Sequence, residues 1–109
     1  MTSPAVRLRG RVYGAVLSHI GTEKYFLVVS NNRRNAHLRS MLAVRLTTTR
    51  KPPLATMVAL GAEEPFAGTV VCDDIIELYD DEITRDIGAL SAAAMQRVNE
   101  GLKVALALS

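Results

Sequence analysis

Residues 21–50, GTEKYFLVVSNNRRNAHLRSMLAVRLTTTR, contain two apolar runs separated by a basic polar segment. The runs cover residues 25–29 and 41–46, and the segment between them is rich in arginine and asparagine. Apolar runs of five or six residues bounded by polar turns are typical of buried strands. We therefore expect two strands of a small barrel, with residues 30–40 forming a basic loop between them.

The second run alternates, which predicts the direction of its side chains. Side chains of a strand point to opposite faces in turn. We expect Leu42, Val44 and Leu46 to face inward, and the outer face to carry Arg45, Thr47 and Thr49. Polar and cationic groups should therefore lie together where this strand ends.

Short strands separated by turn residues continue along the rest of the chain. In residues 8–17, positions 8, 12 and 16 are apolar, so Arg7, Arg9, Arg11 and Tyr13 are expected on the other face. Further strands are predicted over residues 54–60, 68–72 and 75–78. Ser91 is a good N-cap for a terminal helix whose apolar stripe comprises Met95, Val98, Leu102, Ala105 and Leu106. The pattern predicts a single domain over residues 1–109, a small and mostly β (α+β) barrel, with residues 1–6 as a flexible tail.

Charge is distributed unevenly between the two halves. Residues 1–51 hold ten Lys/Arg and one acid, whereas residues 52–109 hold three Lys/Arg and ten Asp/Glu. Such an asymmetry indicates a polyanion-binding face in the first half, although the halves could also attract each other across the fold or a dimer.

Other classes of protein are disfavoured by composition. The single cysteine, Cys72, cannot form an internal disulfide or build a metal site alone. No metal or other cofactor is expected. Apolar runs are far shorter than the ~20 residues that cross a bilayer. The first six residues lack the pattern of a signal peptide, so a cytoplasmic location is expected.

Five stretches, in order, carry a resemblance to a known family: residues 9–13 (RGRVY), 27–35 (LVVSNNRRN), 44–49 (VRLTTT), 68–73 (GTVVCD) and 90–108. Over residues 7–108 the chain resembles the MazF/PemK toxins, most closely their mycobacterial and actinobacterial branch. The resemblance implies an SH3-like barrel working as a homodimer. It also implies the toxin of a type II toxin-antitoxin system, a sequence-specific and metal-independent endoribonuclease that cleaves single-stranded RNA and stops translation. An acidic, MazE-like antitoxin would occupy the RNA groove. Messenger RNA is the expected substrate, with transfer and ribosomal RNA as alternatives.

Metal-free RNA cleavage uses the 2′-hydroxyl of the substrate, and it needs a cation, a hydroxyl donor and a proton-transfer group at the phosphate. By resemblance, Lys24 takes the place of the family's catalytic arginine and Thr47 that of its threonine. Glu23 either orients Lys24 or transfers a proton, and Asp73 matches a carboxylate implicated in some members. Each has a structural alternative: a solvated strand end for Lys24, a β-favouring residue for Thr47 and a turn cap for Asp73.

Arginines and hydroxyls are expected to bind backbone phosphates, and asparagines to contact base edges. The predicted RNA-binding residues are Arg9, Arg11, Asn31, Asn32, Arg33, Arg34, Arg39, Arg45, Thr48, Thr49 and Arg50. Tyr13 and Tyr25 are the candidates for base stacking.

Two other functions remain open at this stage. One is a non-catalytic barrel of the same fold, either a nucleic-acid-binding module or a gyrase poison. Gyrase poisons of this fold rely on a tryptophan near the C-terminal helix, and this chain has no tryptophan. The other is a structural barrel whose basic loop docks an acidic protein.

Overall fold

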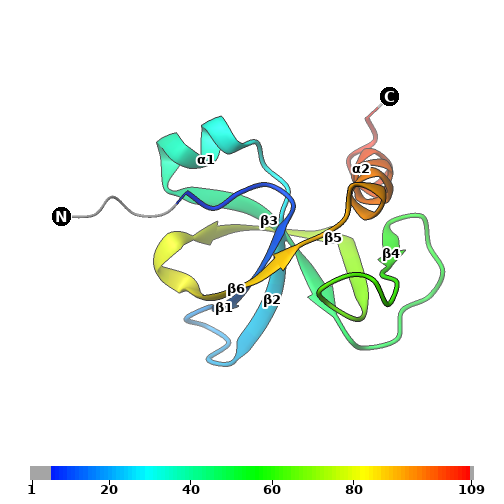
Figure 1. Cartoon of the computed structure of the whole chain (residues 1–109), viewed down its shortest axis with the longest axis horizontal. Coiled ribbons are helices and arrows are strands. Elements are labelled where there is room, and N and C mark those ends of the chain that lie inside the picture. The colour runs from blue at the N-terminus through cyan, green and yellow to red at the C-terminus, as the bar shows by residue number, and fades with distance from the viewer. Residues whose placement is uncertain (1–5, 109) are drawn as a thin grey trace.

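Six strands form one antiparallel sheet in the order β4-β5-β3-β2-β1-β6 in the computed structural model, which describes residues 6–108 (Figure 1). The strands are β1 (Arg11–Val16), β2 (Glu23–Val28), β3 (Ser40–Thr47), β4 (Met57–Ala59), β5 (Thr69–Tyr79) and β6 (Ile83–Ala89). Two helices, α1 (Asn32–Leu38) and α2 (Ala92–Leu106), and a short 3₁₀ turn, η1 (Asp80–Glu82), complete the chain. The predicted mostly β class with a C-terminal helix is confirmed. The tail predicted over residues 1–6 lies, except for Val6, outside the described residues.

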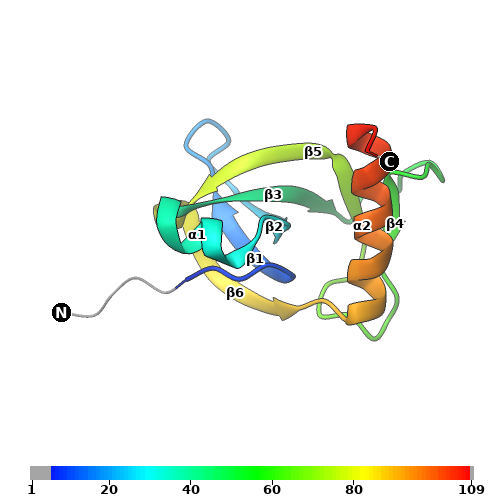
Figure 2. The ribbon, with the colours of Figure 1, turned by 90° about the horizontal axis from the view of Figure 1, so that it is seen from above.

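The sheet curls strongly, with α2 along one end (Figure 2), and its buried residues form two core clusters. One core cluster includes Leu27 and Val44 and packs against α2 through Val98. The other includes Phe26 and Ala43, the strand neighbours of that pair. Consecutive residues of β2 and β3 therefore enter different clusters, which explains why the run over residues 25–29 is apolar without interruption.

The two-sided burial corrects the predicted side-chain directions. Tyr13 is 2% exposed instead of lying outside with the arginines, and its hydroxyl accepts a hydrogen bond from the Leu8 backbone. Leu42 is 38% exposed instead of facing inward, whereas its neighbours Met41 and Ala43 are buried. A simple in–out alternation fails here because a curled sheet has a second buried face.

The predicted basic loop contains a helix, α1. Asn31 caps its N-terminus by accepting a hydrogen bond from the Arg34 backbone N–H, and Arg39 ends it in the left-handed conformation at φ 54°. Asn35 is 3% exposed and bonds to Ser30 and to the Arg7 carbonyl. Polar bonds and caps therefore hold this helix, and it has no apolar stripe that could have predicted it.

β5 is one strand and not the two predicted pieces. Val44 pairs with Ile75 but the next residue, Arg45, pairs with Val71, so residues 72–74 bulge out of the ladder. A bulge bends a strand and redirects its side chains. The fourth strand is also shorter than predicted: β4 covers Met57–Ala59 instead of residues 54–60.

The terminal helix begins as predicted, with the Ser91 hydroxyl accepting from the Ala94 N–H at 3.1 Å. Its stripe packs on the sheet through Met95 and Val98, but Leu106 is 52% exposed and lies beyond the core. Gly101 is buried, and a side chain does not fit there because a Cβ atom would lie 2.7 Å from the Cys72 sulfur. Among the described helices, none has the length and apolar character needed to span a membrane.

Candidate active site

Lys24 and Thr47 lie at the adjoining ends of β2 and β3. Tyr25 pairs with Leu46 and Phe26 with Arg45, so Lys24 and Thr47 stand one residue beyond the last pair. Side chains of directly opposed residues share a face in an antiparallel pair. Lys24, Arg45 and Thr47 accordingly line one pocket of about 180 Å³, which we call the cationic pocket. The predicted convergence of these three side chains is thus present in the structure.

Thr47 is held by contacts on both its hydroxyl and its backbone. Its Oγ1 accepts a hydrogen bond of 3.1 Å from the Thr49 backbone N–H. Gly68, at φ 137°, lies so close to the Thr47 carbonyl that any Cβ at position 68 would collide with it. With its oxygen already accepting, the hydroxyl has its own proton available for a ligand.

Arg45 carries a buried donor that the folded chain leaves unsatisfied. Its Nε is the only buried side-chain nitrogen or oxygen without a hydrogen-bond partner among residues 6–108. An unsatisfied buried donor costs about 1–3 kcal/mol, more when the group is charged. Arg45 also borders a second pocket with Lys51 and Asp74, next to the cationic pocket.

Glu23 is fully engaged by its neighbours. Its carboxylate accepts from Arg85 at 3.0 Å, from the Thr84 hydroxyl at 2.5 Å and from the Tyr25 hydroxyl at 3.2 Å. These bonds, the one from Arg85 first, lower the pKa of Glu23 to about 2. Gly14 leaves room for this carboxylate, since a Cβ there would lie 2.6 Å from its Oε2. Two roles were predicted for Glu23. Because its carboxylate is held by these bonds and its pKa is low, orienting the strand end at Lys24 is favoured over transferring a proton near neutral pH.

Asp73 does not line the cationic pocket. Its carboxylate accepts a 2.6 Å hydrogen bond from the Thr56 hydroxyl, which ties β5 to the segment before β4. Its neighbour Asp74 borders Arg45 instead, because the bulge turns it toward β3. Sequence reasoning missed Asp74 and also Arg85, the partner of Glu23. Only the presence of Asp74 beside Asp73, and of Arg85 as a lone cation in an acidic stretch, could have pointed to them.

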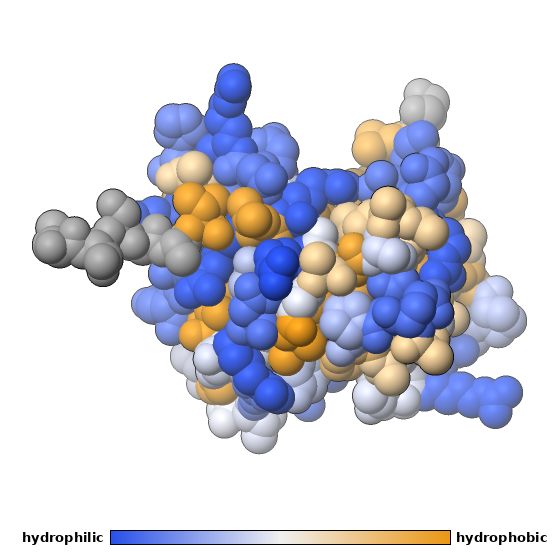
Figure 3. All heavy atoms as spheres, viewed as in Figure 1, coloured by the Kyte–Doolittle hydropathy of each residue, from blue (hydrophilic) through white to orange (hydrophobic). Residues whose placement is uncertain are grey.

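Five of the predicted RNA-binding residues have partners within the protein. Arg9 donates to the Val29 carbonyl and to Asn99, and Arg11 pairs with Asp86 at 2.9 Å. Arg34 donates to the Ser40 carbonyl, Asn31 caps α1, and Asn32 accepts from the Arg9 backbone. Arg11 thereby joins β1 to β6, and the other four stabilise the fold around α1, where Figure 3 shows a hydrophilic outer side.

The remaining members of the predicted set are accessible. Arg33 and Arg39 are exposed on and just after α1, whereas Thr48, Thr49 and Arg50 are exposed after β3. Thr48 and Thr49 also line the cationic pocket. Of the two aromatic candidates for stacking, Tyr13 is buried, and Tyr25 borders this pocket with its ring 5.1 Å from that of Phe66. Within residues 6–108, no group of three His, Cys, Asp or Glu side chains is arranged to hold a metal ion.

A small curled sheet with a C-terminal helix and a cationic pocket at the end of two central strands defines a small, mostly β-barrel protein. The chain belongs to the family of PemK-like, MazF-like toxins of type II toxin-antitoxin systems, which matches residues 8–106. It is 43% identical over 101 residues to endoribonuclease MazF1 of Mycobacterium bovis and to endoribonuclease MazF4 of Mycobacterium tuberculosis, with 93% of this chain and of each relative covered.

Solved structures agree with this assignment. An endoribonuclease from a mycobacterial species, solved with its cognate antitoxin, superposes with a TM-score of 0.88 at 42% identity, covering 94% of this chain and 97% of that one. MazF in a MazE-MazF structure from Deinococcus radiodurans, at 21% identity and a TM-score of 0.82, shares the fold, with 96% of this chain and 99% of that one covered. The predicted family, its actinobacterial branch, the fold class and the toxin type are confirmed, and endoribonuclease is the activity named for the relatives.

Proposed function

We propose that this toxin is a sequence-specific endoribonuclease that cleaves single-stranded RNA at a phosphate bound in the cationic pocket. One observation carries the proposal: Lys24, Arg45 and Thr47 line a single pocket, and Arg45 carries a donor that no described residue satisfies. A phosphodiester offers acceptors to all three groups. Arginine and lysine are the usual phosphate ligands in proteins, and hydroxyls add further donors.

The reaction uses the RNA, solvent water and these side chains. The 2′-oxygen of the substrate forms a bond to phosphorus as its proton passes to solvent water, and the bond from phosphorus to the 5′-oxygen breaks. The products are a 2′,3′-cyclic phosphate and a 5′-hydroxyl. Lys24 and Arg45 stabilise the negative charge of the phosphorane, and the Thr47 hydroxyl donates to one of its oxygens. Lys24 is also the group that can protonate the leaving 5′-oxygen.

Two partners follow from the same proposal. We propose that the toxin works in the cytoplasm as a homodimer and that an acidic antitoxin silences it by covering the basic surface. The ten basic residues in the first half of the chain, and the mycobacterial endoribonuclease solved with its cognate antitoxin, support this part. Light scattering after gel filtration, with and without the antitoxin, measures both assemblies.

Cleavage in the presence of EDTA tests the activity. The purified toxin should cut a long single-stranded RNA at defined sites, leaving 5′-hydroxyl ends. Placing one 2′-deoxynucleotide immediately 5′ of the cut phosphate should abolish cutting there and nowhere else. Intact RNA at micromolar toxin would contradict the nuclease assignment, and cutting at the deoxy position would exclude the internal nucleophile.

A further inference from the structure

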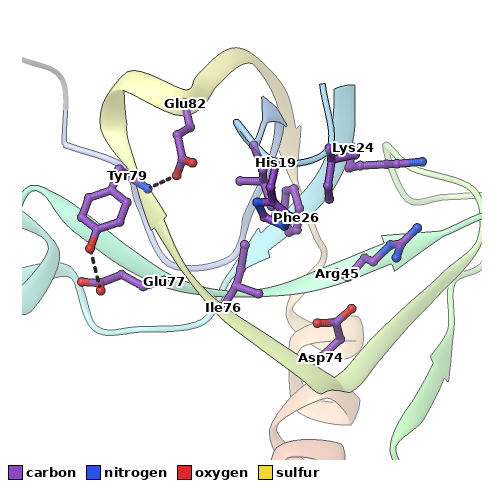
Figure 4. A pocket seen from close by; sticks show the side chains of 11 residues that line it. His19, Lys24, Phe26, Arg45, Asp74, Ile76, Glu77, Tyr79 and Glu82 are labelled. Carbon is purple, nitrogen blue, oxygen red and sulfur yellow. Dashed lines mark hydrogen bonds between the residues drawn. The ribbon is translucent and has the colours of Figure 1, made fainter. Parts of the chain in front are cut away.

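A larger cavity, of about 310 Å³ and distinct from both pockets described above, adjoins the cationic pocket. Lys24 and Arg45 line both spaces, so they form the boundary between them. Leu17, Phe26 and Ile76 give this cavity apolar walls, and the imidazole of His19 lies beside Phe26. Figure 4 shows Lys24, Arg45 and Asp74 at one end and Phe26 and Ile76 in the middle. Its volume is in the range of small-molecule sites, which are largely apolar with a few polar groups that orient the ligand.

Three carboxylates give this cavity a lining of hydrogen-bond acceptors. Glu77 accepts a hydrogen bond from the Ser40 hydroxyl at 2.7 Å and one from the Tyr79 hydroxyl at 3.0 Å. These bonds lower the pKa of Glu77, and the bond from Ser40 has the largest effect. Glu82 accepts from the Tyr79 backbone N–H at 2.8 Å. Asp74, beside Arg45, forms no hydrogen bond or ion pair with any other described residue, so both of its oxygens are available to a ligand.

The charged groups of this cavity determine which part of an RNA it can bind. Glu77 and Glu82, at the end away from Lys24 and Arg45, repel a second phosphate, so the anionic backbone of the RNA belongs in the cationic pocket and on the exposed basic residues. The apolar walls suit a flat base. Acceptor-only carboxylates suit a ligand that carries N–H donors.

We propose that this cavity receives the base of a nucleotide flanking the cut and selects one with an exocyclic amino group over uracil, an inference that rests on the proposed RNA cleavage. Adenine, cytosine and guanine each present an amino group on the Watson–Crick edge, the edge by which proteins recognise single-stranded RNA. Uracil presents two carbonyl oxygens there and a single N–H. A uracil carbonyl facing the Asp74 carboxylate would place two acceptors against each other. Asp74 is thus the specificity-determining residue, and Arg45 can donate to the adjoining ring nitrogen or carbonyl.

Cleavage of an RNA pool randomised around the cut, mapped by sequencing, tests the selection. The wild type should disfavour uracil at one of the two flanking positions by about tenfold or more, the scale of one well-formed contact to a base. Asp74→Asn adds an amide donor and should bring uracil to within about threefold of the other bases at that position only. Asp81→Asn is the matched control, because Asp81 is exposed and outside this cavity; it should keep the wild-type preference.

The outcomes separate the two proposals. If the wild type shows no bias against uracil at either flanking position, the proposal that this cavity selects a base is wrong. The same holds if Asp74→Asn shows the same bias as the wild type. In both cases the proposed RNA cleavage still stands. Absence of any cutting overturns both. If Asp74→Asn is inactive, binding replaces cleavage as the measurement. The affinities of oligoribonucleotides that differ only at that base are measured for Thr47→Ala and for the double variant Thr47→Ala/Asp74→Asn. The same rank order of affinities in the two proteins overturns the inference. A change confined to the affinity for the antitoxin would assign the cavity to an antitoxin side chain and likewise overturn it.

Discussion

The backbone N–H of Thr49 donates a hydrogen bond to the Thr47 Oγ1 over 3.1 Å, at the point where β3 leaves the sheet. This bond holds the oxygen, so the hydroxyl can donate its own proton to a ligand in the pocket that Lys24 and Arg45 also line. The turn after β3 therefore positions a donor for a bound phosphate.

Removing that donor should slow cleavage without unfolding the protein. Thr47→Ala is expected to lower the rate by about 10²-fold or more, the scale of losing one transition-state donor. Thr47→Ser keeps the hydroxyl and should retain most of the activity. Single-turnover rates on a defined RNA measure both variants, and equal rates for Thr47→Ala and the wild type would remove Thr47 from the mechanism.

Glu23 should contribute to stability in a defined pH window. Its pKa falls from an ordinary 4.5 to about 2 through its bonds with Arg85 first and Thr84 next. A carboxyl group with a lowered pKa in the folded state stabilises that state above its unfolded pKa, and the contribution is lost as the pH falls through the folded pKa. Glu23→Gln should thus be less stable than the wild type at pH 5–7, and the difference should shrink between pH 4.5 and 2.

Urea unfolding across that range measures the effect. The exposed Glu63 supplies the control, because Glu63→Gln should change stability little at any of these pH values. A Glu23→Gln deficit that stays constant down to pH 2 would show that its carboxylate bonds are not the cause.

Gly101 should be the exception to the rule that alanine strengthens a helix. Glycine costs a helix interior about 1 kcal/mol relative to alanine. A Cβ at position 101 would lie 2.7 Å from the buried Cys72 sulfur, and overpacking a core costs about 1–3 kcal/mol. We expect Gly101→Ala to be net destabilising, and to become neutral or stabilising when Cys72 is also alanine. Denaturant unfolding of the two single variants and the double variant measures this coupling, and additive effects would contradict it.

Salt dependence should report how many phosphates the protein neutralises. If about four phosphates of single-stranded RNA are bound, log affinity should fall against log salt with a slope near −3, measured with a 2′-deoxy RNA that cannot be cut. Arg45→Met should reduce the slope by about 0.7, the share of one phosphate contact. A flat response would point instead to a site for an acidic protein.

Local patterns predicted the strands at the site, because a buried strand needs a run of apolar residues between polar turns whatever sheet it belongs to. The neighbourhood of Lys24, Arg45 and Thr47 followed from pairing those two strands. The directions of Tyr13 and Leu42 were wrong because alternation assumes one buried face, and this curled sheet has two.

Long-range pairing determined what the sequence could not predict. Asp74 reaches the site only because residues 72–74 bulge from β5 opposite β3. Glu23 meets Arg85 because β1 pairs with both β2 and β6. The short helix α1 lacks an apolar period and depends on its caps and on the buried Asn35. The spacing of residues along the chain does not predict any of these contacts.

The central claim is that Lys24, Arg45 and Thr47 bind a single phosphodiester. The most direct test measures the affinity of an RNA with a 2′-deoxynucleotide at the cut, with and without a neutral methylphosphonate replacing the scissile phosphate. Lys24→Met and Arg45→Met should each weaken binding of the charged RNA by about tenfold and leave that of the methylphosphonate RNA nearly unchanged. Equal losses for both RNAs would show that these side chains act elsewhere, and the proposed site would be wrong.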